Sequence, residues 1–251
     1  MKCGRKAIMW IALVLCLVCA VLLALALHSR AEHAKPASKD PEGAIAAQED
    51  EDRTVDVPVD FAAWQERNPD VYAWIEYPGT NVDYPIVQSA EDDAYYLRRD
   101  IDGKEAVAGS LYTEHTYNSK TFDDPVTVIY GHNMANRTMF GGLQSHIEAA
   151  DLASTEEYFY VYLPGRILTY RVVGGAPGDD AHILYYNDFS DPTGFSNYFG
   201  NLYAQSGEHA NLPGLLRPSP DDRVVILATC MNGEKYLRYL IIGVLTDDTA
   251  D

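Results

Sequence analysis

Short stretches in which β-branched and aromatic residues alternate with polar ones follow one another through the chain from residue 71 onward. Glycine, proline, asparagine and aspartate separate these stretches, as expected of strands joined by turns. About eight strands at this spacing favour a closed barrel or a sandwich over an alternating βαβ fold. We therefore expect a mainly β fold and choose the closed barrel. The expected strands are 71–77, 82–87, 109–113, 126–130, 158–163, 167–173, 223–228 and 237–245.

Stretches with helical spacing interrupt the strands. Asp60 can cap a short helix in which Phe61 and Trp64 share one face, and the sequence Asn68-Pro69 ends it. Two further stretches carry apolar residues at three- and four-residue intervals, which is typical of helices that cover a core with one face. We thus expect an N-terminal helix and two or more inserted helices. The inserted helices contain Phe140, Leu143 and Ile147, and Phe195, Tyr198, Phe199 and Leu202.

The beginning of the chain follows a different pattern, because basic residues within 1–7 precede an uncharged apolar run at 8–27. A membrane helix needs roughly 20 apolar residues, whereas a cleavable signal peptide has an apolar core of about 7–15. The run therefore predicts an uncleaved transmembrane anchor. The small residues of Ala24-Leu25-Ala26 leave cleavage by a signal peptidase as the alternative.

Basic residues ahead of such a run stay in the cytoplasm. We therefore expect a single-pass type II protein of the cell membrane, with a cytoplasmic tail at 1–7 and the remainder outside the cell. Residues 28–57 are rich in alanine, proline, serine and acidic residues without an apolar period, which predicts a flexible stalk. Residues 58–251 then form the extracellular domain.

The charge of the chain excludes one class of partner. The formal net charge is −18, and all acidic residues follow residue 27. Such a charge disfavours binding to a phosphate backbone, so we expect no nucleic-acid partner. Acidity by itself identifies no function.

The positions of the cysteines limit the chemistry that the exported part can carry out. Cys3, Cys16 and Cys19 lie in or beside the apolar run, which leaves Cys230 alone in the exported part. An unpaired exported thiol is an intermolecular link, a buried inert residue or a reactive nucleophile. A lone cysteine after an apolar strand is more often an inert core residue. Cys230 is therefore a candidate nucleophile only if a suitable base lies near it.

Cys230 directly follows the apolar run 224–229, and His132 follows the run 126–130 across Gly131. Two strands that each end in a reactive residue can bring a nucleophile and a base together, although the sequence leaves their contact open. Arg238 starts the last expected strand, where it can lie beside Cys230. A guanidinium keeps its charge and offers several donors to an oxyanion, although an exposed surface charge is the ordinary alternative. The other histidines lie in stalk, helix or loop contexts.

Together these residues resemble the signature of the sortase family: Tyr130-Gly131-His132-Asn133-Met134, then Ala228-Thr229-Cys230, then Arg238. The likeness covers roughly 60–245 and is greatest to class B sortases, which also have a helix before the cysteine strand. Class B members commonly have serine where this chain has Ala228. The other stretches similar to class B are Asn68-Pro69-Asp70-Val71, Trp74-Ile75, Asp83-Tyr84-Pro85-Ile86-Val87-Gln88, Tyr96-Leu97 and Met139-Phe140.

This resemblance implies a sortase-type closed barrel and a cysteine transpeptidase of Gram-positive cells. Such an enzyme cleaves a C-terminal sorting motif of exported proteins through a thioacyl intermediate and joins them to an amine of the cell wall or to a pilin lysine. Cys230 would be the nucleophile, His132 the proton-transfer residue and Arg238 the oxyanion-stabilising cation. The thioester conserves the energy of the cleaved bond, so the resemblance implies neither metal nor cofactor.

Two alternative functions stay open. One is an exported cysteine peptidase or amidase, in which water resolves the thioacyl intermediate. Papain-like enzymes place the cysteine before the histidine, whereas His132 precedes Cys230 here. The other alternative is a non-catalytic exported β-domain in which Cys230 is inert.

Overall fold

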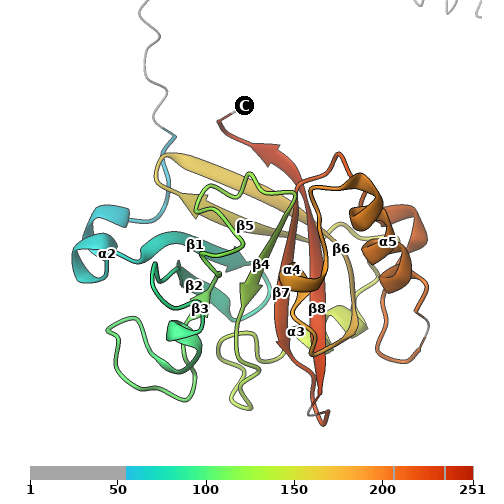
Figure 1. Cartoon of the computed structure of the whole chain (residues 1–251), viewed down its shortest axis with the longest axis horizontal. Coiled ribbons are helices and arrows are strands. Elements are labelled where there is room, and N and C mark those ends of the chain that lie inside the picture. Colours follow the sequence, from blue (N-terminus) through green and yellow to red (C-terminus); the bar gives the residue numbers. More distant parts are fainter. Residues whose placement is uncertain (1–54, 206, 235, 251) are drawn as a thin grey trace, which may run out of the picture. The chain divides into compact units, whose positions relative to one another are not determined.

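Eight strands close into a barrel in the computed structural model, which describes residues 55–205, 207–234 and 236–250. Around the barrel the strands follow the order β1-β2-β3-β4-β7-β8-β6-β5, and β1 pairs with β5 to close it. The pairs β2·β3 and β4·β7 are parallel. The predicted mainly β closed barrel is confirmed. The strands are β1 (Val71–Tyr77), β2 (Val82–Val87), β3 (Leu111–Tyr112), β4 (Val126–Tyr130), β5 (Tyr158–Leu163), β6 (Arg166–Asp179), β7 (Val224–Cys230) and β8 (Leu237–Asp248) (Figure 1).

Alternation placed β1, β2, β4 and β5 at their observed bounds but misjudged the others. The predicted strand 109–113 shrinks to two residues, while 167–173 is wrong in its end, because β6 continues to Asp179. The reason is pairing: β6 and β8 remain paired from Leu168↔Asp248 to Asp179↔Leu237, with two shifts of register between Thr169 and Gly174. A long neighbouring strand therefore keeps a glycine-rich segment extended that side-chain alternation assigns to a turn.

The predicted N-terminal helix is α2 (Phe61–Arg67), and Asp60 caps it by accepting a hydrogen bond from the Ala63 amide at 3.0 Å. The inserted helices are α3 (Leu143–Ala149) and α5 (Pro192–Tyr203), so Phe140 lies before its helix and not within it. Figure 1 shows α2 and α5 on opposite sides of the barrel. The sequence did not predict the short elements, which are α4 (Ile183–Tyr186), η1 (Tyr95–Arg98) and η2 (Gly214–Leu216).

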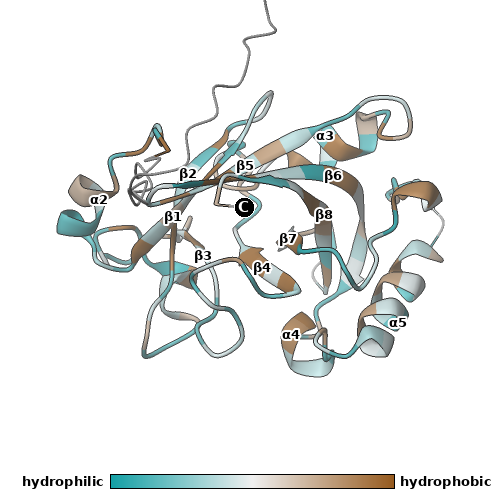
Figure 2. Cartoon of the chain, turned by 90° about the horizontal axis from the view of Figure 1, so that it is seen from above, coloured by the Kyte–Doolittle hydropathy of each residue, from teal (hydrophilic) through white to brown (hydrophobic). Residues whose placement is uncertain are grey.

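Apolar residues fill the barrel and also cover part of its outside. Along β7, Val225 and Leu227 join the interior cluster, whereas Ile226 and Ala228 join a second cluster with Phe195 of α5. A strand that is buried on both faces has a continuous apolar sequence. This explains why β7 is an unbroken apolar run, and the two helices α4 and α5 lie on one side of the barrel over that outer cluster (Figure 2).

Within the described residues, no helix combines the length and apolar character needed to cross a membrane. The predicted cytoplasmic tail 1–7, the predicted anchor 8–27 and the predicted stalk up to residue 54 lie outside those residues.

Candidate active site

The register of two neighbouring strand pairs brings the predicted site residues to one end of the barrel. Cys230, the last residue of β7, lies directly opposite Arg238 of β8. β4 pairs in parallel with β7, with Tyr130 opposite Ala228. His132 follows Tyr130 by two residues and Cys230 follows Ala228 by two residues, so this register brings the segment after β4 beside the end of β7.

The side chains of two of the three site residues, Cys230 and Arg238, belong to the outer face of the sheet. Successive side chains along a strand alternate between faces, so Cys230 shares the face of Ala228, and Arg238 shares that of Leu240. Cys230 is exposed, although the strand behind it is buried. The three residues line one pocket of about 250 Å³ together with Leu97, Tyr112, Glu114, Tyr130, Gly131, Asp179, Asp180, Ala181, His182, Ile183, Ala228 and Thr229.

Gly131 permits the close approach of the His132 loop to the barrel. A Cβ at this position would overlap the side chains of Leu111 and Phe140. The Gly131 amide continues the β4·β7 ladder by donating to the Ala228 carbonyl at 3.1 Å. Any larger residue would therefore push the loop away from β7.

The environment of His132 defines its neutral tautomer. Its Nε2 lies 2.7 Å from the carbonyl oxygen of Leu97, at the end of η1. A carbonyl oxygen only accepts hydrogen bonds, so Nε2 carries the proton. Nδ1 is then the nitrogen left to exchange a proton with a reacting group.

Arg238 retains its hydrogen-bonding capacity at the site. Its guanidinium donates to the carbonyl of Leu237 at 3.3 Å and forms no ion pair with any residue in the described ranges. Burial raises the pKa of Tyr112 above its ordinary value, and the positive charge of Arg238 opposes this rise. A cation that faces a half-enclosed pocket with free donors can stabilise an anion formed there.

The pocket wall contains a histidine–carboxylate pair, His182 and Glu114, that the sequence did not predict. His182 caps α4 by accepting from the Tyr185 amide at Nδ1 (3.1 Å), so Nε2 carries the proton toward Glu114 Oε1 at 3.1 Å. Burial raises the pKa of Glu114, and His182 opposes the rise. The same carboxylate, together with burial, raises the pKa of Tyr130. The two partners come from separate loops without periodic pattern, so no sequence signal joined them.

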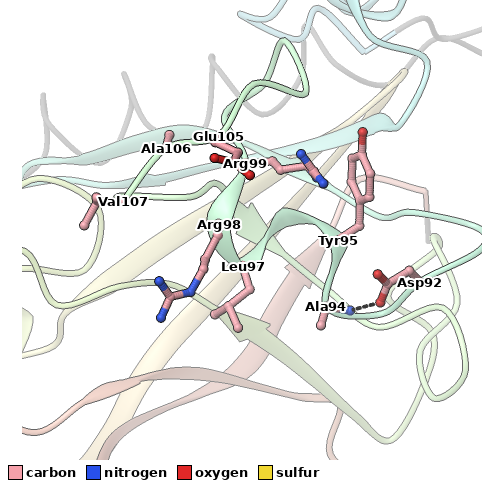
Figure 3. A pocket seen from close by; sticks show the side chains of 9 residues that line it. All are labelled: Asp92, Ala94, Tyr95, Leu97, Arg98, Arg99, Glu105, Ala106 and Val107. Atoms are coloured by element: carbon pink, nitrogen blue, oxygen red, sulfur yellow. Dashed lines mark hydrogen bonds between the residues drawn. The ribbon is translucent and has the colours of Figure 1, made fainter.

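A second pocket of about 590 Å³ borders the first at Leu97, which lines both. Figure 3 shows the side chains of Leu97 and Arg98 pointing to the same side of η1, away from those of Arg99 and Glu105. Arg98 forms no ion pair within the part of the chain that the structure describes. The other lining residues are Asp92, Ala94, Tyr95, Ala106 and Val107.

Three further histidines in the described part of the chain pair with carboxylates elsewhere. His115 contacts Asp93 at 2.6 Å, and His209 contacts Glu148 at 2.7 Å. His146, on helix α3, lies 2.9 Å from Glu157. Among the described residues, no group of histidine, cysteine and acidic side chains is arranged to hold a metal ion.

The known proteins that resemble this chain include sortase B proteins. No family model matches the chain. Sortase B of Listeria monocytogenes is 30% identical over 174 residues, which cover 68% of this chain and 67% of that protein. The X-ray structure of Clostridium perfringens sortase B superimposes with a TM-score of 0.63 at 24% identity, covering 74% of this chain and 100% of that one. The Staphylococcus aureus sortase B–substrate complex gives a TM-score of 0.62 at 18% identity over 74% and 84% of the two chains. These structures share the fold of this barrel.

Proposed function

Because the chain belongs to the sortase family of cysteine transpeptidases and is most similar to class B, we propose that Cys230, His132 and Arg238 are its catalytic residues. The observation that carries this proposal is that the three side chains line one pocket, where Cys230 lies opposite Arg238 and His132 follows the end of β4. We propose that the substrate is an exported protein with a C-terminal sorting motif. The substrate complex of the Staphylococcus aureus relative supports this class of partner.

The first half of the reaction breaks a peptide bond of the sorting motif. The Cys230 thiolate attacks the scissile carbonyl carbon, and Arg238 stabilises the oxyanion of the tetrahedral intermediate. The intermediate collapses to a thioester as the C–N bond breaks, and His132 protonates the departing amine. Nδ1 is the nitrogen that carries this proton, because Nε2 donates to the Leu97 carbonyl.

The second half transfers the acyl group to an amine. The incoming amine of a peptidoglycan cross-bridge or precursor, or of a pilin lysine, attacks the thioester carbon and gives its proton to His132. The C–S bond then breaks, a new amide bond forms, and the Cys230 thiolate and the protonated His132 are restored. The thioester conserves the energy of the first peptide bond, so the transfer itself requires no nucleotide hydrolysis.

We further propose that the enzyme works at the outer face of the cell membrane. Residues 8–27 would anchor it in type II orientation, and residues 28–57 would hold the catalytic domain, 58–251, away from the bilayer. The apolar run and the basic residues before it support this placement. Protease added to intact cells should remove the catalytic domain; protection of that domain until the cells are lysed would refute the orientation.

Intact-mass analysis of the purified protein with sorting-motif peptides tests the reaction. We expect an acyl adduct on the enzyme, followed by a peptide–amine conjugate once an amine acceptor is added. A cysteine peptidase would release the hydrolysed peptide at the same rate with and without the amine. A non-catalytic domain would form no adduct with any peptide.

A further inference from the structure

The side chain of Asn133 joins the two segments that carry the proposed nucleophile and its proton-transfer partner. Asn133 follows His132 in the chain, and its Nδ2 donates to the Cys230 carbonyl at 2.7 Å and to Asn232 Oδ1 at 2.8 Å. One amide group thus uses both of its hydrogens on the end of β7 and the loop after it. Residues 133 and 230 are distant in sequence, so this contact closes the site across the two strands.

The loop that carries Asn133 is folded tightly on itself. Its backbone closes where Phe140 donates to the His132 carbonyl at 3.0 Å and where Asn133 bridges to Met139. Arg137 and Met139 adopt positive φ angles of 63° and 56°, a conformation that non-glycine residues rarely accept. Met139 is nevertheless held there with its side chain 6% exposed. The loop therefore presents Asn133 from a fixed backbone.

The second acceptor, Asn232, is held from the opposite side. Its backbone amide donates to Gln144 Oε1 at 3.0 Å, and Gln144 Nε2 donates to Glu148 at 2.8 Å within α3. Gln144 is only 4% exposed. Asn133 therefore binds to a loop that α3 already fixes. Its two hydrogen bonds hold the loop that carries His132 at a fixed position relative to the end of β7.

We propose that Asn133 is a positioning residue that sets the distance between His132 and the Cys230 thiol during proton transfer. The inference rests on the proposed function of those two residues. Cys230 is exposed at the end of its strand, so few packing contacts restrain it. A displacement of about 1 Å between reacting groups can reduce a rate by roughly 10²-fold, which makes such a restraint important.

Single-turnover acylation with a sorting-motif peptide tests this inference in the full-length protein. We expect Asn133→Ala to lower the acylation rate at saturating peptide by about 10- to 100-fold, with the peptide concentration at half-maximal rate changed less than about twofold. Asn136→Ala is the matched control, because Asn136 lies in the same loop and, among the described residues, its side chain bonds to Thr138 of that loop alone. The control should acylate like the wild type.

A double-mutant cycle separates positioning from a general structural role. If Asn133 acts through His132, Asn133→Ala should have little further effect in the His132→Ala background. Equal fold-losses in both backgrounds would overturn the inference. Asn133→Asp, which has the same shape but no N–H donors, should be at least as slow as Asn133→Ala and provides the test if the alanine variant unfolds.

The result for the wild type keeps the two proposals apart. If the wild type forms no acyl adduct, the proposed function fails whatever Asn133 does. If the wild type forms the adduct and both Asn133 variants match its rate within about twofold, the proposed function stands and the positioning role is refuted.

Discussion

The two ends of the β7–β8 pair differ in whether their charged side chains form ion pairs. At the end away from the pocket, Asp248 of β8 accepts hydrogen bonds from Arg166 at 2.6 Å and from Arg223 at 2.9 Å, and its side chain is only 2% exposed. At the pocket end, Arg238 of the same strand forms no ion pair with the residues described, and Cys230 is exposed. At the first end, Arg166 and Arg223 form ion pairs that stabilise the fold. At the pocket end, Arg238 stays available to a substrate.

The electrostatics follow this division. The Arg166 guanidinium beside Asp248 holds the pKa of that carboxyl well below its usual range, and the carboxyl in turn raises the pKa of Arg166. Charges that neutralise each other in this way add to the stability of the folded chain. A cation kept without a partner adds nothing to stability but can respond to charge that develops in a reaction.

The largest effect should come from the nucleophile. Cys230→Ala should abolish the acyl adduct, because no other thiol of the described residues lies at this pocket, while thermal unfolding stays within a few degrees of the wild type. Intact-mass analysis and thermal melting measure both. An adduct that persists in this variant would contradict the assignment.

The cation at the pocket end should come next. Arg238→Ala should slow acylation by about 10²–10³-fold, the range found when one oxyanion donor is removed. Arg238→Lys keeps the charge but loses the planar set of donors, so its rate should lie between the two. If both variants acylate like the wild type, Arg238 is a surface charge and the contrast between the two strand ends is wrong.

At the opposite end, the expected change is in stability. Asp248→Asn should lower the free energy of unfolding by about 3 kcal/mol, at the low end for a broken buried pair because Arg166 and Arg223 keep contact with water. Acylation should be unchanged while the protein is folded. The control is Asp123→Asn, whose exposed carboxylate contacts the same arginines and should contribute less than about 1 kcal/mol. Denaturant unfolding distinguishes the two variants, and equal losses would contradict the contrast.

Lowering the pH should remove the stabilising contribution of Asp248 gradually. Because the folded-state pKa of Asp248 is depressed, its stabilising contribution is present above the ordinary carboxyl value of about 3.9 and is lost as pH falls below it. The melting temperature of the wild type should therefore decrease below about pH 4, and Asp248→Asn should flatten part of that decrease. If the melting temperatures of the wild type and Asp248→Asn fall in parallel as the pH is lowered, Asp248 does not cause the loss of stability in acid.

Strand ends made the site partly predictable. β4 and β7 are buried on both faces, so each reads as an apolar run, and the reactive residue just beyond it stands out. Gly233 adopts a positive φ of 79°, a conformation that suits the turn between β7 and β8. The structure brings His132, Cys230 and Arg238 to one pocket, as the sequence suggested; their catalytic roles stay a prediction.

The rest depended on the path of loops. Asn133 reaches Cys230, and His182 reaches Glu114, through segments whose course no period in the sequence describes. The extension of β6 likewise followed from its long neighbour and not from its own residues. Local pattern locates the strands and the bounds of four of the eight, whereas the other strand ends and the contacts between loops depend on the closed barrel.

Mapping the acyl group on the enzyme tests the central claim most directly. The protein is incubated with a sorting-motif peptide, quenched in acid and digested, and the modified fragment is identified by mass. The chain also contains Cys3, Cys16 and Cys19, so the position of the group is informative. We predict a hydroxylamine-sensitive acyl group on the fragment with Cys230, which disappears when an amine acceptor is added and reappears as a peptide–amine conjugate. An acyl group on any other residue, or one that the amine does not remove, would contradict the account.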